Sequence, residues 1–270
     1  MSYGLTLDQV RKTNRPAAEP RQWGSVTSLT SVPEYAMYRV DLLPGVAQPM
    51  HFYANGYHAF VESGDIIVRS LDGLGRTETG FATTGDVLPV GQFWVHGLAS
   101  KSGAVVYLFG ARVPEGPIEH LVEPWEEAAV AMEGVETTEL QRLGDRTSDV
   151  REKYWGRIET ILSGDVAAKR IFLKNGSQGS LEYHVEKRET YYVHSGTVKV
   201  GLRIGRAENH SIVLRAGESY DVRPGVMHLR VGLEDSVIIE VSTRDSDSDS
   251  YLVEDGQTYR HIDASFTTSA

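Results

Sequence analysis

The sequence predicts an all-β protein made of two tandem antiparallel β-barrel or jelly-roll domains joined by a short helical linker. Two observations support this prediction. Short segments of alternating apolar and polar residues, separated by Gly, Asn and Asp, fill most of the chain, a pattern typical of sandwiches and barrels. In addition, several landmarks recur at a constant spacing, which indicates that the second half repeats the first.

The repeat has a spacing of 132 residues, as in Trp23 and Trp155 (155 − 23). Four landmarks share this spacing without a gap: Trp23-Gly24 with Trp155-Gly156, Ser63-Gly64 with Ser195-Gly196, Gly85 with Gly217, and His96 with His228. A shared spacing over four landmarks indicates that the two halves have the same fold.

Composition divides the chain into five segments. We expect an N-terminal arm at 1–22, a first β-domain at 23–118, a helical linker at 119–150, a second β-domain at 151–262 and a tail at 263–270. The linker is rich in Ala and Glu and lacks strand alternation, which favours helix. The polar stretch from Arg244, with its run DSDSD, is expected to be a covering loop with solvated charges.

Charge and hydropathy exclude several kinds of partner. The net charge of −10 argues against binding to nucleic acid or to an anionic membrane, because both require clustered Lys and Arg. No apolar run approaches the ~20 residues that span a bilayer. The N-terminus lacks the apolar segment of a secretion signal, and cysteine is absent. We therefore expect a cytoplasmic protein with a small-molecule substrate, as a monomer or a homodimer.

The stretch 180–196 holds the strongest candidate site. His184 and Glu186 are two residues apart in an alternating segment, so in a strand both side chains point to one face. Glu189 follows, and His228 begins a later strand after a Pro-Gly turn. Two imidazoles and two carboxylates suit a divalent metal ion. Without a thiolate, the donors leave Fe, Mn, Ni and Zn open.

These residues resemble the signature of the cupin family, H-x-H, then Glu, then Gly, with a later P-x-x-x-H. The second half is similar, more narrowly, to the small cupins of the type II mannose-6-phosphate isomerase kind, over about 100 residues in one register. The matching positions are Tyr154-Trp155-Gly156, Lys169-Arg170-Ile171, Ser180-Leu181, His184, Glu189, Ser195-Gly196, Pro224-Gly225, His228 and Glu240-Val241. The resemblance implies a bicupin, two double-stranded β-helix domains, with Glu186 where the family has its second His.

The first β-domain is expected to be a degenerate cupin. Subtracting 132 from the four candidate ligands gives Phe52, Ala54, Tyr57 and His96, of which only the last is a good metal ligand. His51 and His58 lie one residue out of this register, which would turn them to the opposite face. A shifted metal site of His51, His58 and His96 is the alternative.

Other residues are expected to complete the pocket of the second domain. Glu186 is either a metal ligand or a catalytic base, and Glu189 is expected to be both ligand and proton shuttle. Strand alternation places Tyr191 on the face of Glu189, Arg230 on the face of His228, and Glu182 on the face of His184. Lys169, Tyr191 and Arg230 are the predicted substrate-binding residues. The alternative is that Lys169 and Arg230 lie outside the pocket or pair with acidic residues.

Such a site suits three functions. The resemblance implies an isomerase or epimerase that transfers a proton next to a carbonyl of a sugar, sugar phosphate or polyoxygenated acid. The second possibility is an Fe(II)-dependent dioxygenase or oxidase, because His184, Glu189 and His228 make a two-histidine, one-carboxylate set. The third is a non-catalytic binding bicupin in which the ion is structural.

Overall fold

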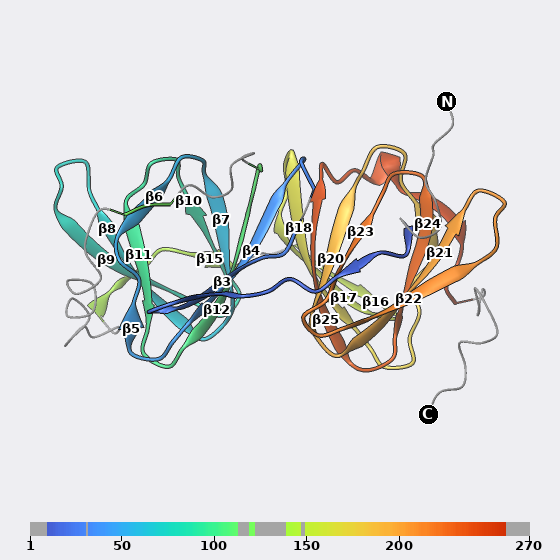
Figure 1. The fold of residues 1–270 in the computed structure, drawn as a ribbon, viewed down its shortest axis with the longest axis horizontal. Helices are drawn as coiled ribbons and strands as arrows, with labels where there is room; N and C mark the ends of the chain where they lie inside the picture. Colours follow the sequence, from blue (N-terminus) through green and yellow to red (C-terminus); the bar gives the residue numbers. More distant parts are fainter. Residues whose placement is uncertain (1–9, 31, 113–118, 122–138, 147–148, 258–270) are drawn as a thin grey trace. The chain divides into compact units, whose positions relative to one another are not determined.

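The computed structural model describes residues 10–30, 32–112, 119–121, 139–146 and 149–257. The chain forms two compact units. One comprises Ala17–Ser148 and is here called the first barrel. The other comprises Met1–Pro16 together with Asp149–Ala270 and is called the second barrel. Each is a set of β-strands around its own apolar core (Figure 1), and the described pairs are antiparallel except for the parallel pair β9–β14. This confirms the predicted all-β fold class.

Two sheets face each other in the first barrel, with strand orders β15-β10-β7-β12-β4-β3-β2 and β13-β6-β11-β8-β9-β14, and β5 pairs with β11. The strands are β2 (Glu19–Arg21), β3 (Gly24–Ser28), β4 (Ala36–Leu42), β5 (Val46–Ala47), β6 (His51–Tyr53), β7 (Tyr57–Ser63), β8 (Asp65–Leu71), β9 (Thr77–Thr83), β10 (Asp86–Val90), β11 (His96–Ser100), β12 (Ala104–Gly110), β13 (Glu119–Leu121), β14 (Gln141–Arg142) and β15 (Asp145–Arg146).

The second barrel repeats this arrangement, with strand orders β1-β23-β20-β25-β18-β17-β16 and β22-β21-β24-β19-β26. Its strands are β1 (Thr13–Asn14), β16 (Val150–Lys153), β17 (Gly156–Leu162), β18 (Val166–Leu173), β19 (Leu181–Tyr183), β20 (Glu189–Ser195), β21 (Thr197–Ile204), β22 (His210–Arg215), β23 (Ser219–Val222), β24 (Val226–Gly232), β25 (Ser236–Thr243) and β26 (Tyr251–Glu254), with a 3₁₀ turn, η2, at Asp247–Asp249.

The repeated Trp-Gly pair has the same physical reason in both barrels. Gly24 and Gly156 have φ of 151° and 153°, a region that residues with a side chain rarely adopt. A Cβ at either glycine would lie 1.8 Å from a backbone carbonyl oxygen, that of Asp41 in one barrel and that of Phe172 in the other. Only glycine permits this close approach of neighbouring strands.

The spacing of 132 is not constant through the site. Opposite His96 on β11 lies His51, whereas opposite His228 on β24 lies Glu182. These partners are 131 apart (182 − 51), while β7 and β20 keep 132. The loop that follows Glu182 is therefore one residue longer than its counterpart.

The edge strands of the two barrels are exchanged. β1, which precedes the first barrel in sequence, pairs with β23 of the second barrel. β15, 132 residues later, precedes the second barrel and pairs with β10 of the first. Val10 is buried in the second barrel's core, where its carbonyl accepts a hydrogen bond of 2.6 Å from the Tyr220 hydroxyl. Within the expected arm at 1–22, the described residues thus contribute β1 to the second barrel and β2 to the first.

The expected linker at 119–150 contributes strands where the structure describes it. β13, β14 and β15 pair with β6, β9 and β10 of the first barrel. Most of the predicted helical stretch, 122–138, lies outside the described residues. Among the residues that the structure describes, there is no helix with the length and hydropathy needed to cross a membrane.

Candidate metal centre

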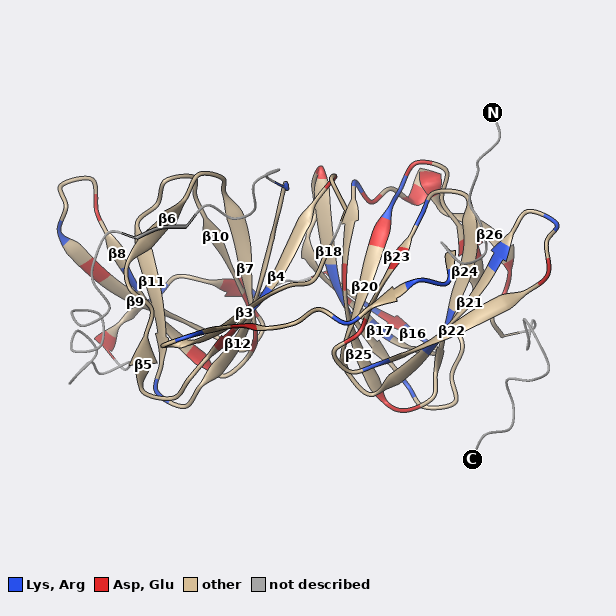
Figure 2. Cartoon of the chain, in the orientation of Figure 1, with Lys and Arg blue, Asp and Glu red and all other residues tan. Residues whose placement is uncertain are grey.

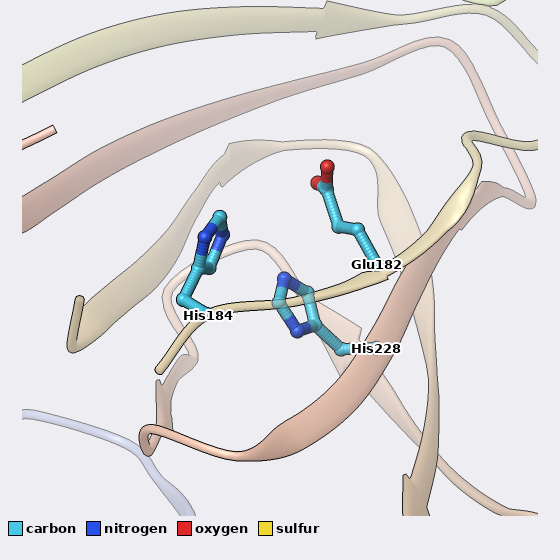
Figure 3. Close-up of side chains that lie close together, drawn as sticks. All are labelled: Glu182, His184 and His228. Carbon is cyan, nitrogen blue, oxygen red and sulfur yellow. The ribbon is translucent and has the colours of Figure 1, made fainter. Parts of the chain in front are cut away.

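Three side chains in the second barrel bring metal-binding atoms together. Glu182 lies on β19, His184 directly follows that strand, and His228 lies on β24 beside it. One ligand atom from each residue falls within 4.8 Å of the other two (Figure 3). Ligands bound to one ion at about 2.1 Å lie at most ~4.2 Å apart, so small side-chain rotations would close the set around a divalent cation.

Both histidines are held in the tautomer that metal ligation needs. Nδ1 of His184 donates to the backbone oxygen of Asp249 at 2.8 Å, and Nδ1 of His228 donates to that of Val226 at 3.0 Å. With the ring proton on Nδ1, Nε2 is left with its lone pair available. Within the described part of the chain, the buried Nε2 of His228 has no aligned hydrogen bond. The donor set therefore fits a divalent metal ion.

Glu189, the first residue of β20 and a predicted ligand, has its carboxylate beside both histidines. Its side chain is buried, with Oε1 2.9 Å from Nε2 of His228 and Oε2 3.9 Å from Nε2 of His184. The Tyr191 hydroxyl donates to Oε1. Burial opposes the change, but the ammonium of Lys187 holds the pKa of Glu189 well below its usual range. Glu189 therefore stays ionised and available to a cation.

Glu186, predicted as a ligand or base, lies elsewhere. Its side chain is exposed, and only its backbone N–H is engaged, by the carboxylate of Asp249. The physical reason is that β19 ends at Tyr183, so the alternation expected to align Glu186 with His184 does not extend that far. Glu182 occupies the first position of the H-x-H pattern instead, with His184 second. Strand alternation, which places Glu182 on the same face as His184, was the sequence signal that could have identified Glu182 as a ligand.

A buried lysine replaces Glu186 in the interior. Nζ of Lys187 lies 2.6 Å from Glu189 Oε2, 2.9 Å from Glu240 Oε1 and 3.0 Å from Asp245 Oδ1. Burial favours the neutral amine, but these three carboxylates raise the pKa of Lys187 well above its ordinary value. Lys187 could not be predicted as an interior residue, because it lies in a turn, where strand alternation carries no information.

Three of the donors, Glu182, His184 and Glu189, line a pocket of about 380 Å³, a volume that suits a small molecule. Lys169 and Arg230, two of the predicted substrate-binding residues, line it, and each is also paired with carboxylates, which was the alternative expectation. Lys169 lies 2.7 Å from Asp245, while Arg230 lies 3.1 Å from Glu182 and 3.4 Å from Glu240.

Tyr191, the third predicted substrate-binding residue, is fully buried behind Glu189. Its ring lies 5.4 Å from the Arg230 guanidinium, and its hydroxyl is bonded to Glu189. This places Tyr191 as a support for these two charged groups.

The acidic segment after β25 covers the pocket, as expected, but its charges are not simply solvated. Asp245 pairs with Lys169 and Lys187. The carboxylate of Asp249 accepts the backbone N–H groups of Val185, Glu186 and Lys187 at 2.8–3.2 Å. These acidic positions are red in Figure 2. The segment therefore fixes the loop that presents the ligands.

The equivalent position in the first barrel is an aromatic cluster. The rings of His51 and His96 are 4.7 Å apart, Trp94 stacks on His96 at 5.0 Å, and Tyr53 packs against both histidines. His51 therefore faces inward, and the expectation that it points away is wrong because of the one-residue difference in spacing. His58 lies half-buried on β7, where it follows Tyr57.

Burial lowers the pKa of His51, and burial together with His51 lowers the pKa of His96 to about 3. Both rings are neutral at pH 7. With Tyr53 and Tyr57 in the places of His184 and Glu189, this barrel lacks the donor set of the second, in line with the expectation of a degenerate half.

No family model matches the sequence. The protein "Mannose-1-phosphate guanylyltransferase 2" of Escherichia coli O157:H7 is 31% identical over 135 residues, which cover 46% of this chain and 26% of that protein. The chain thus spans about a quarter of the length of this relative. The narrower resemblance to type II mannose-6-phosphate isomerases gains no support from these comparisons.

Among solved structures, the chain is similar to oxalate decarboxylases. The formate complex of the Lactobacillus farciminis enzyme has a TM-score of 0.64 at 16% identity, over 88% of this chain and 86% of that one. A Bacillus subtilis oxalate decarboxylase, whose Mn(II) centres were studied, has a TM-score of 0.65 at 13% identity, over 88% and 77% of the two chains. At such identities the likeness concerns the fold. The chain therefore shares the fold of these enzymes, with two tandem β-barrels of antiparallel strands.

Proposed function

We propose that the second barrel is the active site of a metal-dependent enzyme that acts on a small polar acid. The observation that carries this proposal is the pair His184 and His228, each with Nδ1 bonded to a backbone carbonyl, grouped with Glu182 and Glu189 beside a pocket of small-molecule size that His184 lines. A divalent ion held there would act as a Lewis acid that polarises a carboxylate or carbonyl oxygen of the substrate.

Charge supports an anionic substrate. Around the donors, four carboxylates (Glu182, Glu189, Glu240 and Asp245) face three cationic groups (Lys169, Lys187 and Arg230). The described inner groups thus carry one uncompensated negative charge when the imidazoles are neutral. A divalent ion would reverse this to one positive charge, which favours a carboxylate ligand over a neutral sugar.

The arrangement of carboxylates bears on the reaction class. Isomerisation or epimerisation, the first expectation from the sequence, needs a base that removes a carbon-bound proton. Glu186 is exposed, and Glu189 is engaged by Lys187 and Tyr191. Loss of CO₂ from a bound carboxylate needs no such base at its first step. This favours decarboxylation, the activity named for the structural neighbours, although it is not among the classes predicted from the sequence.

The surrounding residues have distinct parts in such a reaction. Lys169 and Arg230, both on the pocket wall, would orient the substrate's oxygens. Tyr191 and Lys187 hold Glu189 in place. The acidic segment over the pocket would limit the access of water, which strengthens these charge interactions.

The test is to strip the protein of metal, reload it separately with Mn, Fe(II), Ni or Zn, and incubate it with oxalate and a panel of hydroxy and oxo acids. We expect metal-dependent CO₂ release without net O₂ consumption, and its loss in His228→Gln. Deuterium uptake from D₂O without CO₂ would indicate the isomerase class, and stoichiometric O₂ uptake the oxygenase. Stoichiometric metal with none of these responses would contradict an enzymatic role.

A further inference from the structure

Lys187 is the one described lysine placed among the candidate metal ligands. Its side chain is 4% exposed, and its ammonium contacts three carboxylates at 2.6, 2.9 and 3.0 Å. An ammonium group has three N–H donors, so Glu189, Glu240 and Asp245 use all of them. Lys187 therefore has no donor left for a substrate.

The lysine belongs to the loop that distinguishes the two barrels. Four residues separate His184 from Glu189, whereas three separate their counterparts Tyr53 and Tyr57. At the equivalent position of the first barrel, Tyr57 stands in place of Glu189, and the one lysine in residues 17–148, Lys101, is exposed. The buried lysine, Lys187, is therefore found in the barrel that has the buried carboxylate of Glu189.

Glu189 is shared between Lys187 and the metal site. One of its oxygens lies 2.6 Å from Nζ of Lys187, and the other lies 2.9 Å from Nε2 of His228. An ion bound by the histidines and Glu189 would share the Glu189 carboxylate with the ammonium of Lys187. Both are positive, and in a buried site like charges repel strongly. The same ammonium compensates the buried carboxylates in the absence of an ion.

We infer that Lys187 is a built-in competitor of the metal ion. Its ammonium balances the interior carboxylates so that the metal-free barrel stays folded, and it weakens the site for divalent ions so that the bound ion exchanges readily. This inference rests on the metal site of the proposed function, but it does not depend on which reaction the site performs.

Competition with the ion and simple positioning of Glu189 predict opposite changes in metal affinity when Lys187 is removed. If Lys187 only positions Glu189, its removal will misplace a ligand and weaken metal binding. If it competes with the ion, its removal will strengthen metal binding, while the metal-free protein becomes less stable.

The experiment compares wild type, Lys187→Met and Lys187→Arg by calorimetric titration of the metal-free proteins with Mn²⁺ and Co²⁺, and by melting with and without metal. We expect Lys187→Met to bind at least about tenfold more tightly than wild type. Its metal-free melting temperature should be lower, and metal should raise it by more than in wild type. Lys187→Arg should keep the weaker binding.

Lys169→Met is the matched control. Lys169 lines the same pocket and pairs with Asp245 at 2.7 Å, yet it does not contact Glu189. We expect its metal affinity to change by less than about threefold, because the removed charge is farther from the ligand.

Unchanged or weaker metal binding by Lys187→Met overturns the inference. So does a Lys187→Met protein that stays unfolded in saturating metal, because a competing ion must be able to replace the charge of the ammonium. Tighter binding by Lys187→Arg also overturns it. If neither wild type nor Lys187→Met binds metal, the proposed function fails and the inference with it. If only Lys187→Met binds, the inference stands while the proposed function of the wild type fails.

Discussion

The backbone oxygen of Asp249 accepts a 2.8 Å hydrogen bond from Nδ1 of His184, while the carboxylate of the same residue accepts the backbone N–H groups that follow this histidine. One residue outside the donor group thus sets both the tautomer of a ligand and the shape of its loop. Mutation of a residue that orients a metal ligand in this way commonly lowers metal affinity by about tenfold or more.

The first prediction concerns Asp249. Asp249→Ala removes the acceptor for the N–H groups of Val185 and Lys187, so the loop loses its fixed geometry. We expect metal affinity to fall by about tenfold, measured by calorimetry. Asp247→Asn, an exposed neighbour in the same turn, is the control and should bind as wild type does. Equal affinity in both variants would contradict a positioning role for Asp249.

The second prediction separates Glu182 from Glu186. Glu182→Gln removes one negative charge from the donor group, and it leaves Arg230 without one of its carboxylate partners. We expect metal affinity to fall by at least about tenfold. Glu186→Gln changes an exposed side chain and should leave affinity and turnover unchanged. The opposite result would restore the ligand set predicted from the sequence.

The third prediction concerns acid stability of the second barrel. Burial opposes the change, but Lys187 and Lys169 lower the pKa of Asp245 to about 2. A depressed carboxyl pKa stabilises the fold above the unfolded value near 3.8, and this contribution is lost as pH falls from about 4 to about 2.

After allowance for partial exposure, the contribution of Asp245 is roughly 1–2 kcal/mol. Asp245→Asn should therefore be less stable at pH 7 and show a shallower loss of stability between pH 4 and pH 2, measured by urea unfolding. Glu189 keeps part of the slope, because its pKa is also depressed. An unchanged slope would show that Asp245 is not paired in solution.

The fourth prediction concerns the first barrel, where burial and the neighbouring His51 hold the pKa of His96 at about 3. The unfolded chain binds a proton near pH 6.5 that the folded barrel excludes, so stability is full above pH 6.5 and falls as pH drops toward 3. His96→Phe keeps an aromatic ring against Trp94 but cannot take up this proton.

We expect the first-barrel strands of His96→Phe to lose less hydrogen-exchange protection than wild type between pH 6.5 and pH 4, after correction for intrinsic exchange rates. His210→Gln in the second barrel serves as the control and should behave as wild type does. If His96→Phe and wild type lose the same amount of hydrogen-exchange protection, protonation of His96 does not destabilise the first barrel, which would contradict this prediction.

Much of the architecture could be predicted from the sequence, because the repeat leaves a physical mark at Gly24 and Gly156, where a strand approaches too closely for any side chain. The same repeat misled the alignment of the site. A constant spacing of 132 holds for Trp23 and Trp155 and again for His96 and His228, but His51 and Glu182 are 131 apart. The second barrel thus has one residue fewer before β19 and one more after it, and because the two changes cancel, the flanking landmarks do not reveal them.

The site was predictable where strands supply it and not where turns do. Glu189 and His228 lie on strands, so alternation gave their faces correctly. Glu186 and Lys187 lie in a turn whose shape depends on Asp249, more than 60 residues later in the chain. Which of the two side chains enters the barrel is decided by that distant contact and cannot be obtained from local periodicity.

The exchange of edge strands sets an order of events during synthesis. Thr13 pairs with Tyr220, so this strand emerges from the ribosome 207 residues (220 − 13) before its partner exists. At about 5–20 residues per second the delay is roughly 10–40 s. The second barrel therefore cannot close until Tyr220 has been synthesised, whereas the first barrel, whose strands all lie within residues 17–148, can fold while the second is still being made.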